Sequence, residues 1–190
     1  MNCFVINSSD TLCIRPMVWE DLEQVLVIEH LSFSLPWPAS AYQYELNENP
    51  NSLLWVAEES TLSNHKQIVG MIVIWLIMDE AHIATLAVHP ENRRTGIARY
   101  LLTVALKEIF HRGIRHATLE VRSSNNIAIP LYQQFGFKIV GQRPKYYRDN
   151  NEDALIMTVD DLDIQFRSQL ENNVGSGIQG VNQWVLKKTW

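Results

Sequence analysis

Residues 88–98 read Val88-His89-Pro90-Glu91-Asn92-Arg93-Arg94-Thr95-Gly96-Ile97-Ala98, and this order of strand, turn and helix sets the architecture. The apolar run before it predicts a buried strand that Pro90 ends. The first backbone N–H groups of a helix are unpaired and lie at the positive end of its dipole. Two arginines and a glycine at such a helix start therefore predict a site for a phosphorylated cofactor. A plain strand-to-helix connection is the alternative.

Patterns of strand and helix alternate on both sides of this turn. Apolar runs predict strands at residues 12–15, 53–57, 68–77, 83–88, 117–121, 137–140 and 154–159. Helical spacing predicts helices at residues 20–33, 40–47, 97–110 and 125–135. We expect one domain over residues 1–162 that mixes helices with mainly antiparallel strands. A tail, residues 163–190, is expected to be partly disordered or docked through its tryptophans.

Charge and composition are those of an ordinary globular protein. The chain has 190 residues, an apolar fraction of 46% and a formal net charge of −5, which argues against binding to nucleic acid or to a membrane surface. No signal peptide and no apolar run long enough to span a bilayer is evident, so we expect a cytoplasmic location. Cys3 and Cys13 are expected to be free thiols. The six histidines lack the spacing of a metal site, so no metal is expected.

Two later stretches carry candidate chemistry. Glu120 interrupts the apolar strand pattern Thr118-Leu119-Glu120-Val121. A carboxylate at a buried strand end can act as a general base, and a solvated outward residue is the alternative. In the next predicted helix, Tyr132 lies on the side that carries Ala128 and Phe135. An ordinary core tyrosine is the alternative to a catalytic role there.

Taken in order, these stretches resemble the GNAT superfamily of acetyl-CoA-dependent N-acetyltransferases. The matching patterns are V-x-P-x-x-R-x-x-G-x-A, L-E-V-R-x-S-N and A-x-x-L-Y-x-x-x-G-F, within about residues 10–160. Tyr146-Tyr147, Glu152–Met157 and Phe33–Trp37 resemble its RimI-type branch, the ribosomal-protein-alanine N-acetyltransferases. The resemblance implies a GNAT-like α/β (α+β) fold, with a mainly antiparallel central sheet of about six to seven strands, about four flanking helices and splayed central strands.

The resemblance also implies a role for each matching residue. Acetyl-CoA is the implied cofactor, and no metal takes part. Its pyrophosphate would be held by Arg93, Arg94 and the backbone that follows, and its pantetheine arm would pair with the preceding strand. The implied cofactor contacts are Leu86, Ala87, Val88, Arg93, Arg94, Thr95, Gly96, Ile97, Ala98, Asn125 and Tyr132. Glu120 is the implied base, and Tyr132 the implied acid that protonates the departing thiolate. The implied acceptor contacts are Phe33, Trp37, Tyr146 and Tyr147.

The expected activity is acetyl transfer to the N-terminal amine of a protein, by direct attack in a ternary complex. The resemblance implies the N-terminal alanine of a ribosomal protein as acceptor. An α-amine suits a single carboxylate base, since with a free pKa of about 8 on the order of a tenth of it is already neutral near pH 7. Two alternatives stay open: acetylation of a small amine or lysine side chain, and a non-catalytic acyl-CoA-binding module. The exact target, the breadth of specificity and the oligomeric state stay open as well.

Overall fold

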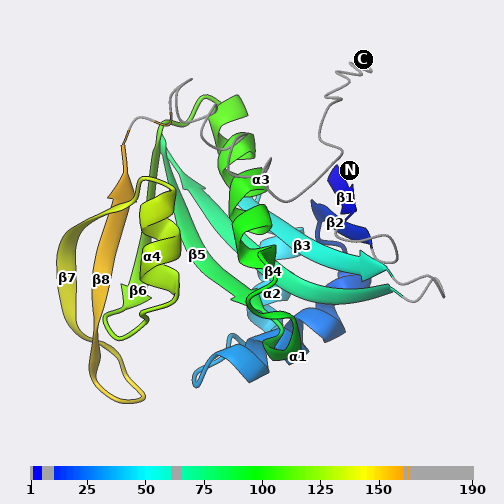
Figure 1. The fold of residues 1–190 in the computed structure, drawn as a ribbon, viewed down its shortest axis with the longest axis horizontal. Helices are drawn as coiled ribbons and strands as arrows, with labels where there is room; N and C mark the ends of the chain where they lie inside the picture. Colours follow the sequence, from blue (N-terminus) through cyan, green and yellow to red (C-terminus); the bar gives the residue numbers. More distant parts are fainter. Residues whose placement is uncertain (1, 6–10, 61–65, 161, 163–190) are drawn as a thin grey trace.

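The structure, a computed structural model, describes residues 2–5, 11–60, 66–160 and 162, and it places the turn at residues 88–98 between a central strand and a central helix (Figure 1). The strands are β1 (Asn2–Val5), β2 (Thr11–Pro16), β3 (Ser52–Ser60), β4 (Lys66–Ile77), β5 (Glu80–Val88), β6 (His116–Arg122), β7 (Lys138–Tyr147) and β8 (Glu152–Val159). The helices are α1 (Leu22–Ser32), α2 (Ala39–Asn47), α3 (Ile97–His111) and α4 (Ala128–Gln134), with the 3-10 turns η1 (Trp19–Asp21) and η2 (Pro90–Asn92). The predicted tail, residues 163–190, lies outside the described residues.

The strands form one sheet in the order β1-β2-β3-β4-β5-β6-β8-β7. Every neighbouring pair is antiparallel except β5 and β6, which are parallel. The predicted fold class, a mixed and mainly antiparallel sheet with four α-helices, is confirmed. Within the described residues the sheet has eight strands, because β1 pairs with β2 at one end.

The two parallel strands separate halfway along their length. Their register runs only from Glu80–His116 to Ile83–Leu119, and Figure 1 shows the strands diverging beyond it. A register shift between β4 and β5 lies at the same place, where Ala84 is the extra residue of β5. Such a bulge bends its strand and increases the local twist. The predicted splay of the central strands is therefore confirmed, and the β5 edge beyond Ile83 does not pair with β6.

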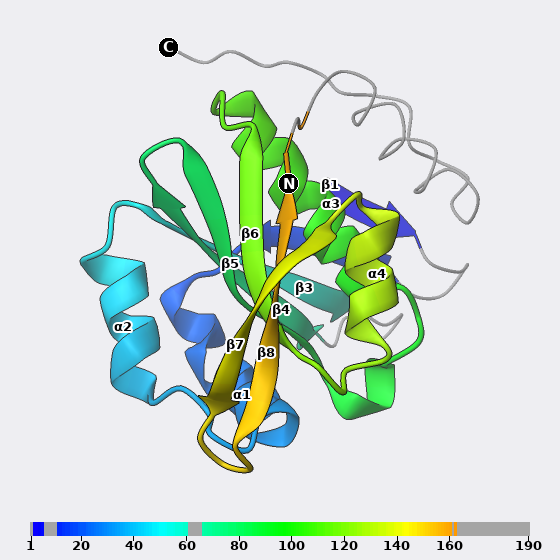
Figure 2. The same cartoon turned by 90° about the vertical axis from the view of Figure 1, so that its left-hand side faces the viewer.

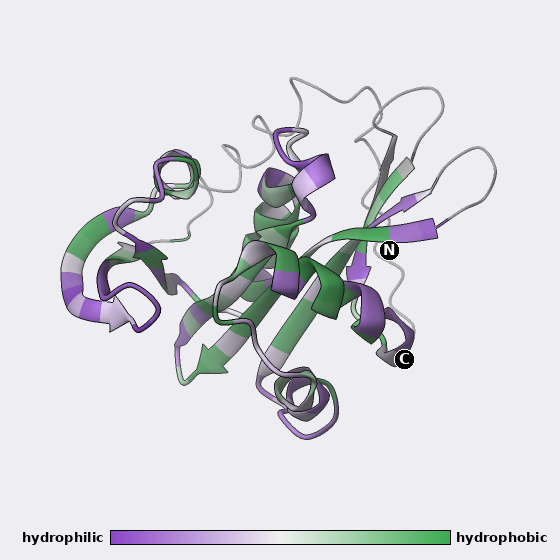
Figure 3. Ribbon diagram, turned by 90° about the horizontal axis from the view of Figure 1, so that it is seen from below, coloured by the Kyte–Doolittle hydropathy of each residue, from purple (hydrophilic) through white to green (hydrophobic). Residues whose placement is uncertain are grey.

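Helices cover both faces of the sheet. One hydrophobic core joins the sheet to α3 and α4, and a second joins it to α1 and α2. Figure 2 shows α2 and α4 on opposite sides of β6, and in Figure 3 the hydrophobic colouring is concentrated on the central strands and on α3. The β5–β6 gap therefore opens between two helical layers.

The prediction of a free thiol is wrong for Cys13, which is disulfide-bonded. The other cysteine of the chain, Cys3, is its partner in the register of β1 and β2. Residues directly opposite in an antiparallel pair have Cα atoms about 4.5–5.5 Å apart, which is within the range of a disulfide. The register of this strand pair, which the spacing in the sequence does not reveal, brings the two positions together.

Replacing Gly70 by alanine should destabilise the protein by about 1–3 kcal/mol, because the site is already full. A Cβ there would meet side-chain atoms of Ile97 and Leu101 at 3.0 Å and the backbone oxygen of Ala87 at 3.2 Å. Urea unfolding would measure the loss. Gly141→Ala is the matched control, since its Cβ would meet Ile156 at 3.4 Å, an ordinary contact. Equal stability of the two variants would contradict this account of how α3 packs on β4.

Candidate active site

The turn before α3 leaves the start of the helix open. Gly96 is the N-cap residue, with a φ of 90°, and no side chain caps the helix. Arg94 also has a positive φ, of 66°, and the hydroxyl of Thr95 holds the turn by donating to the carbonyl oxygen of Asn92 at 2.6 Å. The residues from Arg94 to Gly96 are exposed. An uncapped helix start with a nearby arginine and an exposed glycine fits an anionic group such as a pyrophosphate.

The two arginines of this turn have different surroundings. The Arg93 side chain donates to the carbonyl oxygen of Val88 and to the hydroxyl of Ser32, each at 3.1 Å. It therefore ties the turn to the end of α1. Both arginines are exposed, but the guanidinium of Arg93 is engaged in these two contacts, so Arg94 is the better placed of the two to meet a phosphate.

Glu120 lies where the central strands part. It is the first β6 residue beyond the last pair with β5, and its side chain is only 10% exposed. Its Oε2 lies 3.2 Å from Nε2 of His82 on β5, and its Oε1 lies 3.0 Å from a guanidinium nitrogen of Arg143 on β7. The alternative of a solvated outward glutamate is therefore wrong. A shielded carboxylate at this point can bind an ammonium group and accept its proton.

Tyr132 is buried on α4, with its ring edge-on to Phe137 at 5.8 Å between centroids. Burial raises its pKa well above the usual tyrosine value, and the nearby Tyr147 adds to this. Burial also raises the pKa of Tyr147 to about 12, with the charge of Glu120 among the further causes. Both hydroxyls therefore hold their protons at neutral pH. Tyr147 interacts electrostatically with both predicted catalytic residues.

Asn125 is tied to the start of α4. Its Oδ1 accepts a hydrogen bond from the backbone N–H of Ala128, the first residue of that helix, at 3.0 Å. An asparagine amide also has two N–H donors. The predicted contact with the cofactor arm would use that nitrogen.

The predicted acceptor residues divide between the interior and the surface. Trp37 is half-buried against the core, with its ring stacked on Trp75 at 5.7 Å and tilted against Tyr42 at 5.6 Å. Phe33 and Tyr146 are exposed, and Tyr147 is half-buried. The surface aromatics are therefore available to an acceptor, whereas Trp37 supports the loop from beneath.

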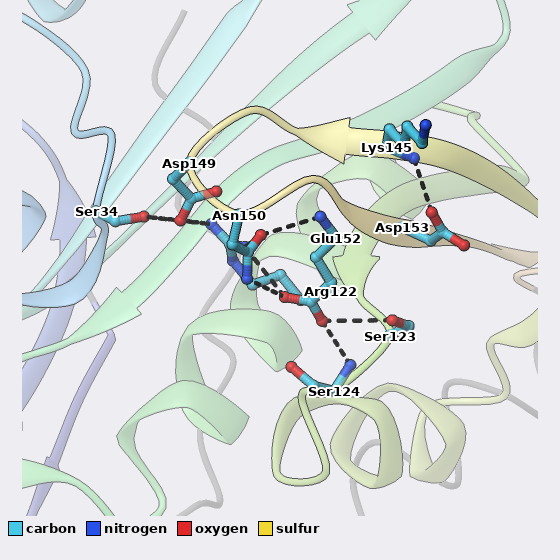
Figure 4. Close-up of polar contacts among 9 residues, drawn as sticks. All are labelled: Ser34, Arg122, Ser123, Ser124, Lys145, Asp149, Asn150, Glu152 and Asp153. Carbon is cyan, nitrogen blue, oxygen red and sulfur yellow. Dashed lines mark hydrogen bonds and ion pairs between the residues drawn. The ribbon is translucent and has the colours of Figure 1, made fainter.

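A network around Arg122 joins the loop at residues 33–37 to the turn between β7 and β8 (Figure 4). The sequence patterns do not predict this network. Arg122 contacts Asp149 at 2.7 Å and Glu152 at 3.1 Å, and the hydroxyl of Ser34 donates to Asp149. Glu152 accepts from the backbone N–H of Ser124 at 2.8 Å, and hydrogen bonds with Ser124 lower its pKa to about 2. Ser34, Arg122 and Glu152 all lie in the stretches that resemble the family, but these stretches are far apart in the sequence, which does not show that they meet.

A buried carboxylate on α1 supports the loop at residues 33–37, called the acceptor loop below. Glu29 is 1% exposed and accepts hydrogen bonds from the backbone N–H of Trp37 at 2.9 Å and from the hydroxyl of Tyr42 at 2.8 Å. Burial raises its pKa, and these two hydrogen bonds oppose the rise. Because the effect of burial outweighs that of the hydrogen bonds, keeping the Glu29 carboxylate ionised in the folded protein costs folding free energy.

Replacing Glu29 by glutamine should therefore change how stability depends on pH. Because the folded pKa of Glu29 is raised, its stabilising contribution is full below the unfolded value of 4.5 and is lost as the pH rises through the folded value. Glutamine does not titrate, so the variant should gain stability relative to the wild type as the pH rises from about 4.5. Urea unfolding of both proteins at each pH would test this. A constant difference would contradict the raised pKa.

Among the described residues, the helices are all too short or too polar to cross a membrane. The same part of the chain holds no cluster of three or more His, Cys, Asp or Glu side chains that could bind a metal ion.

The chain is similar to N-acetyltransferases in both sequence and structure. The model of the acetyltransferase (GNAT) family matches residues 21–137. The ribosomal protein bS18-alanine N-acetyltransferase of Escherichia coli K12 is 32% identical over 141 residues, 73% of this chain and 90% of the relative. A Bacillus subtilis protein provisionally named for the same activity is 38% identical over 146 residues, 77% of this chain and 93% of the relative. The crystal structure of the E. coli ribosomal-protein-S18-alanine N-acetyltransferase matches with a TM-score of 0.69 at 26% identity, covering 92% of this chain and 99% of that one.

Proposed function

Because the chain belongs to the acetyltransferase (GNAT) family, we propose that it transfers the acetyl group of acetyl-CoA to the N-terminal amine of a protein, with the N-terminal alanine of ribosomal protein bS18 as the favoured acceptor. The observation that carries the proposal is the shielded Glu120 at the point where β5 and β6 part. The two bS18-alanine relatives, which match over most of their length, support the choice of acceptor.

The donor side uses backbone groups of the turn and of β5. The N–H groups at the start of α3, with Arg94 beside them, bind the pyrophosphate. The β5 edge beyond Ile83, which does not pair with β6, accepts the pantetheine arm as an added strand. Asn125 donates from its amide nitrogen to the same arm. When bound, acetyl-CoA supplies the thioester carbonyl that the amine attacks.

The acceptor side uses Glu120 as the base. The α-ammonium of the acceptor meets the Oε1 side of the carboxylate, where it replaces the guanidinium of Arg143. That exchange costs little, because the Arg143 side chain is 55% exposed. Glu120 then accepts the proton, directly or through a water, and leaves the amine neutral for attack. Tyr132 holds the proton that the departing thiolate takes up, and because burial raises its pKa it gives up that proton less readily than an ordinary tyrosine.

A single carboxylate base suits an α-amine better than a lysine side chain. Glu120 is the one carboxylate proposed to take up the proton, and it has a partner on each oxygen. A lysine side chain, with a pKa of about 10.4, needs a stronger base or more desolvation than an α-amine with a pKa of about 8. Acetylation of a small amine is the second enzymatic candidate, since one fold serves many acceptors.

One experiment separates these candidates. The protein is incubated with labelled acetyl-CoA and three acceptors: a peptide beginning with alanine, the same peptide with a blocked N-terminus and an internal lysine, and a small free amine. Mass spectrometry should locate the label on the N-terminal alanine. Preferential labelling of lysine or of the free amine would contradict the proposal. Tight binding of acetyl-CoA with no transfer to any N-terminal peptide would favour the non-catalytic module.

The proposed acceptor also indicates the cellular location of the enzyme. Because ribosomal proteins occur in the cytoplasm, we propose that the enzyme acts there. The bacterial origin of the two bS18-alanine relatives supports this.

A further inference from the structure

We propose that His82 is a positioning residue for Glu120: its Nε2–H donates to one carboxylate oxygen and thereby aims the other at the acceptor amine. The proposal rests on the proposed function, in which Glu120 is the base. His82 belongs to none of the motifs that indicate the family, and its part in the site follows from the fold alone.

The contact spans the point where the strands separate. His82 pairs in register with Thr118, and Glu120 lies two residues further along β6, just beyond the last pair. Its Oε2 is 3.2 Å from Nε2 of His82. His82 lies in the part of β5 that pairs with β6. It therefore contacts a carboxylate in the part of β6 that no longer pairs with β5.

The imidazole is itself held by stacking. Its ring lies 5.6 Å from that of Trp75 with 18° between the planes, and Trp75 stacks on Trp37 at 5.7 Å and 12°. Trp37 donates its backbone N–H to the buried Glu29. The row of rings therefore connects α1 and the acceptor loop to the base, and it restricts the direction in which Nε2 points.

The two partners of Glu120 differ in how firmly they are held. Arg143 reaches Oε1 with a side chain that is 55% exposed, whereas the side chain of His82 is 19% exposed. When the acceptor ammonium replaces Arg143 at Oε1, His82 still holds Oε2. A carboxylate fixed by one oxygen keeps the other in a constant direction, which matters because a small misplacement of a reacting group costs a large factor in rate.

Three substitutions of His82 separate hydrogen bonding from packing. His82→Ala loses both and should lower kcat for the alanine peptide about tenfold, with KM for acetyl-CoA unchanged. His82→Gln loses the ring but keeps an N–H donor, and it should recover most of kcat. His82→Phe keeps a ring on Trp75 without a donor, and it should be as slow as His82→Ala. Full activity of His82→Phe, or no recovery in His82→Gln, would overturn the proposal.

His116, at the start of β6, is the matched control. Its Nδ1 lies 3.2 Å from Oδ1 of Asp160, so it makes a histidine–carboxylate contact away from Glu120. His116→Ala should keep the wild-type kcat. A loss equal to that in His82→Ala would overturn the specific role of His82.

A second measurement does not depend on the acceptor. In protein labelled with carbon-13 at the glutamate carboxyl carbons, the Glu120 signal is assigned by its loss in Glu120→Gln. The signal should shift in His82→Phe and stay in His116→Ala. If the wild type acetylates no N-terminal peptide, the proposed function fails while this measurement still tests the contact. A Glu120 signal that is identical in the wild type and in His82→Phe would overturn the role of His82.

Discussion

Replacing Glu120 by glutamine should lower kcat for the alanine peptide by about 10²- to 10⁴-fold, the usual contribution of a positioned general base. Glutamine has nearly the same volume and can still accept a hydrogen bond from His82, but it cannot take up a proton. The dissociation constant for acetyl-CoA should not change, since the turn at residues 88–98, which we propose binds the cofactor, is a separate part of the site. Steady-state kinetics, with acetyl-CoA binding measured by calorimetry, would give both values.

The control for this experiment is Glu108→Gln on the outer part of α3. Glu108 pairs with Arg112 at 2.8 Å on the exposed surface, where such pairs contribute little. This variant should have wild-type activity. If Glu120→Gln also kept wild-type turnover, the proton would have to leave by another route, and Glu120 would no longer be the base.

Replacing Gly96 by alanine should weaken acetyl-CoA binding about tenfold or more, which corresponds to about 1.4 kcal/mol. A methyl group at the helix start stands in the way of an anion that must approach the backbone closely. The φ of 90° at Gly96 is also unfavourable for alanine, by about 1–2 kcal/mol. Calorimetric titration with acetyl-CoA would measure the binding, and urea unfolding the stability.

Gly113→Ala separates these two effects. Gly113 has a φ of 87°, follows the other end of α3, and a Cβ there would meet nothing within 4 Å. It should lose a similar amount of stability while binding acetyl-CoA as the wild type does. Equal affinity of both variants for acetyl-CoA would show that the turn at residues 88–98 does not contact the cofactor.

The regular elements were largely predictable because their patterns are local. The helix at residues 97–110 and the strands of the sheet interior carry continuous apolar faces, and the structure has them with longer ends. β7 was predicted only to Val140 and extends to Tyr147. Most of its residues are exposed, so the apolar pattern that reveals a strand is missing there. Pairing with β8 forms the strand instead.

The candidate site shows the same division between local and long-range signals. Residues 88–98, which we propose bind the pyrophosphate of acetyl-CoA, are eleven consecutive residues whose conformation depends on a glycine, a proline and the start of a helix, so the sequence alone could predict this part of the site. Glu120 and Tyr132 stood out in the strand and helix patterns, the resemblance gave them and Asn125 their predicted roles, and the structure supplies their surroundings.

Those surroundings depend on strand register. His82 and Arg143, the two partners of Glu120, come from β5 and β7, and Trp75, which holds the imidazole, comes from β4. No spacing in a sequence encodes such contacts, because a shift of one residue in the pairing would turn each side chain to the opposite face of the sheet. A local turn can therefore be recognised from its own residues, whereas the surroundings of Glu120 exist only once the five strands β4 to β8 have been aligned.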